Sequence, residues 1–102
     1  SSKVRPALVV SDGLIGRDIV LVAISSVVRP DQFDSDLVLD SQHSDFSSSG
    51  LLRTSVVRTH HIATVQDRVV TRILGHLANR WLAEVDARLR ATLGLTVKPS
   101  GT

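Results

Sequence analysis

Cysteine, methionine and tyrosine are absent from this sequence of 102 residues, and only Phe33, Phe46 and Trp81 are aromatic. The lack of cysteine excludes disulfides, thiolate metal ligands and cysteine nucleophiles. The longest uncharged, mainly apolar stretch, 19–28, covers 10 residues, against the ~20 needed to span a bilayer. The first residues do not resemble a signal peptide. These absences predict a soluble, cytoplasmic protein with no membrane association.

The composition indicates one folded domain over residues 1–102. Hydrophobic residues make up 42% and charged residues 22% of the chain, close to the averages of globular proteins. Valine and isoleucine together number 20, and such β-branched residues favour strands. Residues 96–102 follow the last helical pattern and are expected to form a flexible tail.

Charge is distributed unevenly along the chain. Residues 1–50 carry four basic and seven acidic side chains, whereas residues 51–102 carry eight basic and three acidic ones. The net charge is +2 and the isoelectric point is about 9.9. This distribution favours a basic face able to meet phosphate groups, although scattered solvated charge would give the same totals.

Apolar segments separated by turn residues predict several short strands. The predicted strands are 4–11, which Pro6 confines to a sheet edge or a strand start, 18–25, which is typical of a strand buried on both faces, 37–39, 51–58 and 62–65. Residues 42–50 are polar and serine-rich, which predicts a flexible surface loop, and 66–76 suit a short helix followed by a strand.

A terminal helix is predicted from Asn79, as N-cap, to Gly94, as C-cap. Its buried face would carry apolar residues at three- and four-residue steps, namely Leu82, Val85, Leu89 and Leu93. Its exposed face would carry two acid-first ion pairs, Glu84–Arg88 and Asp86–Arg90. Short strands closed by one helix predict a mostly β (α+β) fold, a small barrel or curled sheet.

Common site motifs are missing. The chain has no glycine-rich phosphate loop, no G-x-S-x-G and no H-E-x-x-H. His60 and His61 are adjacent, so on a strand they would point to opposite faces and could not jointly bind one metal ion. We therefore expect no metal site and no cofactor.

Polar residues at the predicted strand ends form the candidate site. Arg5 precedes Pro6, which holds its backbone extended, and the pair Ser25-Ser26 ends a buried strand. Arg53 stands where the loop at 42–50 returns to the sheet, with Ser55 close by. Taken singly, each residue could equally form a surface ion pair, cap a turn or stay solvated.

The order of these segments resembles the MazF/PemK family of toxin endoribonucleases. The similar segments, which span roughly residues 3–95, are KVRPALVVSD, IVLVAISS, GLLRTSVVRTHHIATVQ and LGHLANRWLAEVDARLRATLGL. The resemblance implies an SH3-like small β-barrel with a C-terminal amphipathic helix, a homodimer, and an antitoxin partner with an acidic disordered tail. It also implies metal-independent, sequence-specific cleavage of single-stranded RNA (mRNA), in which the ribose 2′-OH attacks the adjacent phosphate to give 2′,3′-cyclic phosphate and 5′-OH ends.

The resemblance also implies roles for individual residues. Arg5 and Arg53 match arginines that the family uses in catalysis, and Ser25 matches its catalytic threonine. RNA contacts are expected from the neighbouring polar residues Lys3, Ser26, Ser55, His60 and His61. A histidine would also suit proton transfer better than an arginine, because its pKa lies nearer to neutral pH.

Three departures keep other functions open. The family's first strand, with its following loop, has no counterpart in this sequence, Ser25 replaces threonine, and His60-His61 replace an acidic or amide pair. One alternative is a non-enzymatic inhibitor similar to the CcdB proteins that bind gyrase, with its activity in the C-terminal helix. Another is a truncated relative that has lost activity.

Overall fold

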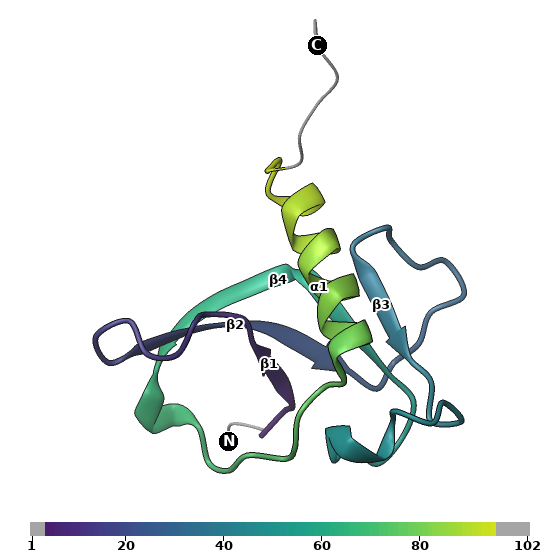
Figure 1. The fold of residues 1–102 in the computed structure, drawn as a ribbon, viewed down its shortest axis with the longest axis horizontal. Coiled ribbons are helices and arrows are strands. Elements are labelled where there is room, and N and C mark those ends of the chain that lie inside the picture. Colours follow the sequence, from purple (N-terminus) through teal and green to yellow (C-terminus); the bar gives the residue numbers. More distant parts are fainter. Residues whose placement is uncertain (1–3, 96–102) are drawn as a thin grey trace, which may run out of the picture.

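The computed structural model describes residues 4–95, and Lys3 and the predicted tail at 96–102 lie outside this range (Figure 1). The described residues form strands, two short 3-10 helices and one α-helix, which are β1 (Ala7–Val9), β2 (Asp18–Ser25), β3 (Asp36–Leu39), η1 (Ser47–Ser49), β4 (Ser55–Gln66), η2 (Asp67–Val69) and α1 (Asn79–Thr92).

The four strands form one antiparallel sheet in the order β1-β2-β4-β3. The long strands β2 and β4 curl, and α1 lies across β3 and the part of β4 that pairs with β3 (Figure 1). The prediction of a mostly β, SH3-like fold with a C-terminal helix is confirmed, as a sheet curled into a half-barrel.

The predicted strand 18–25 matches β2, whereas the predicted strand 4–11 is reduced to β1, which begins directly after Pro6. On β2, Ile19, Val22 and Ile24 are buried and the intervening residues are only partly covered. Ile19 lies on the face opposite to Val22 and Ile24 and outside the core cluster, so both faces of β2 are covered, as expected, but neither is covered completely.

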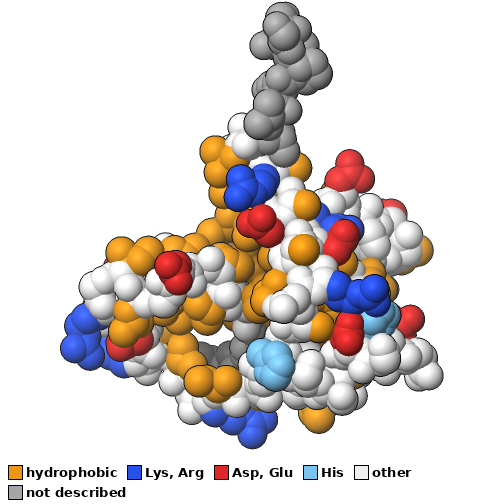
Figure 2. Space-filling model, in the orientation of Figure 1, with side chains coloured by type: hydrophobic (Ala, Val, Ile, Leu, Met, Phe, Trp, Pro, Cys, Tyr) orange, Lys and Arg blue, Asp and Glu red, His pale blue; other side chains and the backbone are white. Residues whose placement is uncertain are grey.

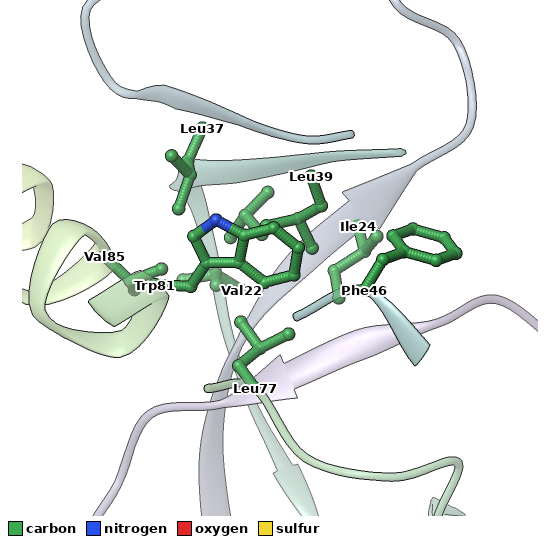
Figure 3. Packing of buried hydrophobic residues seen from close by; sticks show 9 residues of the cluster. Val22, Ile24, Leu37, Leu39, Phe46, Leu77, Trp81 and Val85 are labelled. Carbon is green, nitrogen blue, oxygen red and sulfur yellow. The ribbon is translucent and has the colours of Figure 1, made fainter. Parts of the chain in front are cut away.

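The core lies between α1 and the part of the sheet that contains β3. It contains residues from three strands, the loop before η1, the segment before α1 and α1 itself, namely Val22, Ile24, Leu37, Leu39, Phe46, Val57, Leu77, Trp81 and Val85. The Trp81 ring lies between Leu37 and Leu77 (Figure 3). Burial of this large ring, 7% exposed, holds the helix on the sheet.

The two predicted strands 51–58 and 62–65 are parts of one strand, β4, which begins only at Ser55, so residues 51–54 are not in a strand. Its register with β2 jumps from Val22↔Ile62 to Ala23↔Arg58, so residues 59–61 form a bulge. Within this bulge the His60 and His61 rings meet edge to face with centroids 4.4 Å apart. The prediction that they point to opposite faces was wrong, because the bulge interrupts the alternation of a regular strand.

Helix α1 confirms the predicted ion pairs, Glu84–Arg88 at 2.7 Å and Asp86–Arg90 at 3.2 Å. Acidic and basic side chains are interspersed along its exposed face (Figure 2). The buried face centres on Trp81 and Val85, so the predicted burial of Leu82 and Leu93, which are exposed, was wrong.

The two helix ends differ in how well they were predicted. Residue 78, an alanine without a side-chain cap, occupies the N-cap position in place of Asn79. At the other end Gly94 is left-handed (φ 70°), with N–H groups of Gly94 and Leu95 bonded to the carbonyls of Ala91 and Arg90. This is the Schellman geometry that the predicted glycine C-cap implies.

Two loop predictions need correction. The serine-rich segment 42–50 contains η1 and buries Phe46 and Ser49, so it is anchored to the core. In the segment 66–76, Gln66 ends β4 and the short helix η2 follows, but the predicted strand after the helix is not formed. Along residues 4–95, no helix is long and apolar enough to cross a membrane.

Candidate active site

The antiparallel order brings three of the predicted site residues to one end of the sheet. Arg5 precedes β1, Ser25 ends β2 and Arg53 precedes β4, and these ends adjoin because neighbouring strands run in opposite directions. The β1–β2 register pairs Ala7 with Ala23, and the Ile24 N–H donates to the Pro6 carbonyl at 3.2 Å. Continuing this register places Arg5 opposite Ser25.

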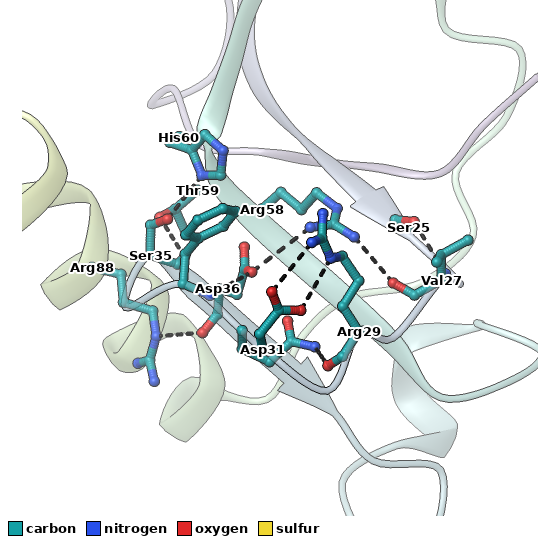
Figure 4. Close-up of polar contacts among 12 residues, drawn as sticks. Ser25, Val27, Arg29, Asp31, Ser35, Asp36, Arg58, Thr59, His60 and Arg88 are labelled. Carbon is teal, nitrogen blue, oxygen red and sulfur yellow. Dashed lines mark hydrogen bonds and ion pairs between the residues drawn. The ribbon is translucent and has the colours of Figure 1, made fainter.

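The Ser25 hydroxyl is oriented by its own turn. Its Oγ accepts a hydrogen bond from the Val27 N–H at 3.1 Å, a short side-chain-to-backbone loop typical of serine at a strand end (Figure 4). Since this bond uses a lone pair of the oxygen, the hydroxyl hydrogen remains available for donation to a ligand. Ser26, next in the chain, is exposed.

Ser55 lies in the chain between Arg53 and Val56, the β4 residue that pairs with Ser25. Ser55 is buried, at 3% exposed, and its Oγ donates to the Arg53 carbonyl at 2.8 Å. In this structure Ser55 therefore supports the backbone of Arg53, whose own side chain is exposed.

The arginines fall into two groups according to their ion pairs. Among residues 4–95, six lie within 4.0 Å of a carboxylate: Arg17, Arg29, Arg58, Arg80, Arg88 and Arg90. In the same range Arg5, Arg53, Arg68 and Arg72 make no such pair. The sheet end with Ser25 thus carries two of the guanidinium groups that no carboxylate of this range neutralises.

Arg29, although close to this end in sequence, is engaged by Asp31. Its Nε and Nη2 each donate to the Asp31 carboxylate at 3.3 Å. The Arg29 guanidinium, mainly through these bonds, lowers the pKa of Asp31 below its usual value. Arg29 is therefore a poorer phosphate ligand than Arg5 or Arg53.

The two histidines lie elsewhere. His60 Nδ1 is 2.8 Å from Ser35 Oγ, and its ring meets Phe33 edge to face with centroids 5.5 Å apart. His60 and His61 lie in the bulge of β4, opposite Val22 and Ala23 of β2, and not beside Val56, the partner of Ser25. The structure does not bring His60 and His61 to the Arg5–Ser25 end.

One buried ion pair near Ser25 was missed by the sequence analysis. Asp36 and Arg58 are direct cross-strand partners, and Arg58 Nη1 lies 3.7 Å from Asp36 Oδ2 (Figure 4). The Arg58 side chain is 13% exposed and the Asp36 side chain 1% exposed. The sequence did contain a clue to this pair, because each of the two apolar strands carries one charged residue. When DLVL is aligned antiparallel with SVVR, Asp36 lies opposite Arg58.

At the sheet end Arg5 and Arg53 are exposed and Ser25 is partly buried. Two hollows of about 490 and 410 Å³ lie beside α1, and their linings include neither Arg5, Ser25 nor Arg53. Within residues 4–95, no three His, Asp or Glu side chains are grouped so that they could hold a metal ion. The arrangement offers charged and hydroxyl donors on an exposed sheet end, which suits an extended anionic ligand.

Fold and site together define a small, mostly β domain with two exposed arginines and a serine hydroxyl at one end of a curled sheet. Over residues 1–93 the chain matches the family model described as PemK-like, MazF-like toxin of type II toxin-antitoxin system, and it belongs to this family. A comparison with curated proteins finds no match.

Mycobacterial proteins are among the solved structures that share this fold. The Mycobacterium tuberculosis toxin MazF-mt6 is 18% identical, with a TM-score of 0.74 over 91% of this chain and 89% of that one. An endoribonuclease in complex with its cognate antitoxin, from a mycobacterial species, is 22% identical, with a TM-score of 0.74 over 92% of this chain and 84% of that one. These likenesses establish the shared fold.

Proposed function

We propose that this toxin is a metal-independent endoribonuclease that cleaves single-stranded RNA at specific short sequences. The observation that carries the proposal is the gathering of Arg5, Ser25 and Arg53 at one end of the sheet, with both guanidinium groups exposed and unpaired within residues 4–95. The family match and a fold neighbour that is itself an endoribonuclease support the same activity.

In the proposed reaction the ribose 2′-OH attacks the adjacent phosphorus and the bond to the 5′-oxygen breaks. The 2′-OH loses its proton, the leaving 5′-oxygen gains one, and the products carry 2′,3′-cyclic phosphate and 5′-OH ends. Negative charge builds on the non-bridging oxygens in the transition state. Fixed donors aimed at such charge are among the largest contributors to catalysis.

The three residues have separate roles in this scheme. Arg5 binds two phosphate oxygens with its planar fork, and Arg53 approaches from the β4 side. Ser25 donates its hydroxyl hydrogen to a non-bridging oxygen, since its lone pair is engaged by Val27. Along the bound strand, Ser26, His60 and His61 would contact neighbouring nucleotides, because all three are exposed.

Two protein partners are proposed. The first is a cognate antitoxin whose acidic tail would occupy the site, because carboxylates bind the same arginine donors as phosphates. The second is another copy of the chain, since β1 and β3 are edge strands of the described sheet and edges favour pairing or cover. We propose the cytoplasm as the location of this activity, because the proposed substrate is mRNA.

Incubation of the purified protein with a long single-stranded RNA in excess EDTA tests the proposal. We expect discrete fragments whose 5′-OH ends accept phosphate from a polynucleotide kinase without prior dephosphorylation, and whose 3′ ends carry cyclic phosphate. The Arg5→Ala variant serves as the control for contaminating nucleases. Intact RNA, or cleavage that requires added Mg²⁺ or Zn²⁺, would contradict the proposal, and intact RNA would favour a CcdB-like inhibitor or an inactive relative.

A further inference from the structure

The turn after Ser25 is held from two sides. The Val27 N–H donates to Ser25 Oγ at 3.1 Å, and the Val27 carbonyl accepts a hydrogen bond from Arg58 Nη2 at 3.0 Å (Figure 4). The peptide groups before and after Val27 are therefore both fixed. The first bond is accepted by the candidate catalytic hydroxyl oxygen, and the second is donated by a side chain of β4.

Arg58 is itself anchored in the protein. Its Nη1 lies 3.7 Å from Asp36 Oδ2, and that oxygen also accepts the Phe33 N–H at 3.0 Å. The Asp36 carbonyl accepts from Arg88 Nε of α1 at 3.1 Å. The Arg58 side chain is mostly buried and forms an ion pair with a buried carboxylate, which restricts the movement of the donor to the Val27 carbonyl.

We propose that Arg58 is a positioning residue for Ser25, an inference that rests on the proposed function. With the Val27 carbonyl held, the Val27 N–H keeps the Ser25 oxygen in one orientation and leaves its hydrogen directed toward the site. When that carbonyl is released, Ser25 can exchange among its staggered rotamers, and its hydroxyl spends less time directed at the phosphate of the bound RNA. Arg58 acts through this turn, because its side chain is mostly buried.

The variant Arg58→Lys tests the proposal without removing the charge that Asp36 requires. Lysine has a single ammonium nitrogen and cannot reproduce the fork that spans Asp36 and the Val27 carbonyl. We expect a folded protein whose single-turnover rate at saturating RNA falls by about 10- to 100-fold, the scale of a misplaced catalytic group. The RNA concentration for half-saturation should change by no more than about twofold, because the arginines that bind the phosphate are intact.

Arg29→Lys is the matched control. Arg29 undergoes the same chemical change close to the same turn, but its side chain bonds to exposed Asp31 and not to Val27. Its cleavage rate should equal that of the parent. An equal loss in both variants would overturn the specific role of Arg58.

A double-mutant cycle separates positioning from general stabilisation. If Arg58 acts through the Ser25 hydroxyl, Arg58→Lys should cost nothing further in rate when added to Ser25→Ala, while its effect on the melting temperature should persist. Effects on rate that multiply in the double variant would overturn the proposal, as would parental activity in Arg58→Lys alone.

Hydrogen exchange of the Val27 amide reports the turn independently of activity. We expect this amide to exchange faster in Arg58→Lys than in the parent and in Arg29→Lys. If the parent cleaves RNA and the Val27 exchange rate is unchanged by Arg58→Lys, the positioning role is wrong. If the parent cleaves no RNA but the exchange rate rises, the proposed function fails and Arg58 is left as a purely structural clamp.

Discussion

Gly50 lies directly against the backbone of Leu74. A Cβ built on Gly50 would overlap the Leu74 carbonyl oxygen and lie 2.7 Å from the Leu74 carbonyl carbon. Next to this contact the His76 N–H donates to the Ser48 carbonyl at 2.9 Å. The segment leading to Arg53 is therefore packed on the chain that enters α1, which explains why the serine-rich loop is ordered into a helical turn.

Gly50→Ala should destabilise the protein more than Gly13→Ala. Both glycines are left-handed, with φ of 71° and 69°, but nothing lies within 4 Å of a Cβ on Gly13. Backbone strain alone should cost roughly 1–2 kcal/mol in each variant, and the overlap at Gly50 should add roughly 1–3 kcal/mol. Urea unfolding measures both losses. Equal losses would mean that the contact with Leu74 is easily relieved.

Ser25→Ala should lose RNA cleavage, whereas Ser25→Thr should retain it. Only the hydroxyl is required, and loss of one fixed donor to developing charge lowers the rate by about 10²–10³. Single-turnover cleavage of a labelled RNA is the measurement, with thermal melts to confirm folding. An alanine variant as active as the parent would remove Ser25 from the mechanism.

Arg53→Lys should cleave poorly although it keeps the charge. A lysine ammonium cannot donate two parallel hydrogen bonds to phosphate oxygens in the way that a guanidinium does. Because the Arg53 side chain is exposed, the free energy of unfolding of the variant should lie within about 0.5 kcal/mol of that of the parent. Full activity in this variant would show that Arg53 contributes only its charge.

An acidic antitoxin tail should compete with RNA for the sheet end that holds Arg5 and Arg53. In fluorescence anisotropy, increasing amounts of the tail should displace a labelled, non-cleavable RNA from the protein. Arg5→Ala should weaken both ligands, because both would bind the same guanidinium group. Simultaneous binding of tail and RNA would show that they occupy separate surfaces.

Local patterns in the sequence were sufficient for β2 and for α1. The apolar run of β2 is a short-range signal, and so are the i,i+4 ion pairs of α1 and the glycine that follows it. Both elements were found where they were predicted. The choice of buried residues on α1 was harder. Trp81 rather than Leu82 faces the sheet, because the direction from which the helix docks is set by tertiary packing and not by helical periodicity.

Features that depend on pairing between distant segments could not be read from local patterns. The bulge at 59–61 arises only because β4 changes register against β2, and it reverses the expected orientation of the two histidines. The pair Asp36–Arg58 likewise requires the register of β3 on β4. By contrast, the three strand-end residues were proposed together from their positions at predicted strand ends and from the family resemblance, and the antiparallel order of the sheet brings them to one end.

The central claim is that Arg5 binds the scissile phosphate, and the most direct test is single-turnover RNA cleavage by Arg5→Ala beside Arg90→Ala. Both side chains are exposed, and Arg90 pairs with Asp86 on α1, so each variant should melt like the parent. Arg88 is unsuitable as a control because it bonds to the Asp36 carbonyl. We predict a loss of about 10²–10³ in rate for Arg5→Ala and none for Arg90→Ala. Parental cleavage by a normally folded Arg5→Ala would contradict the account.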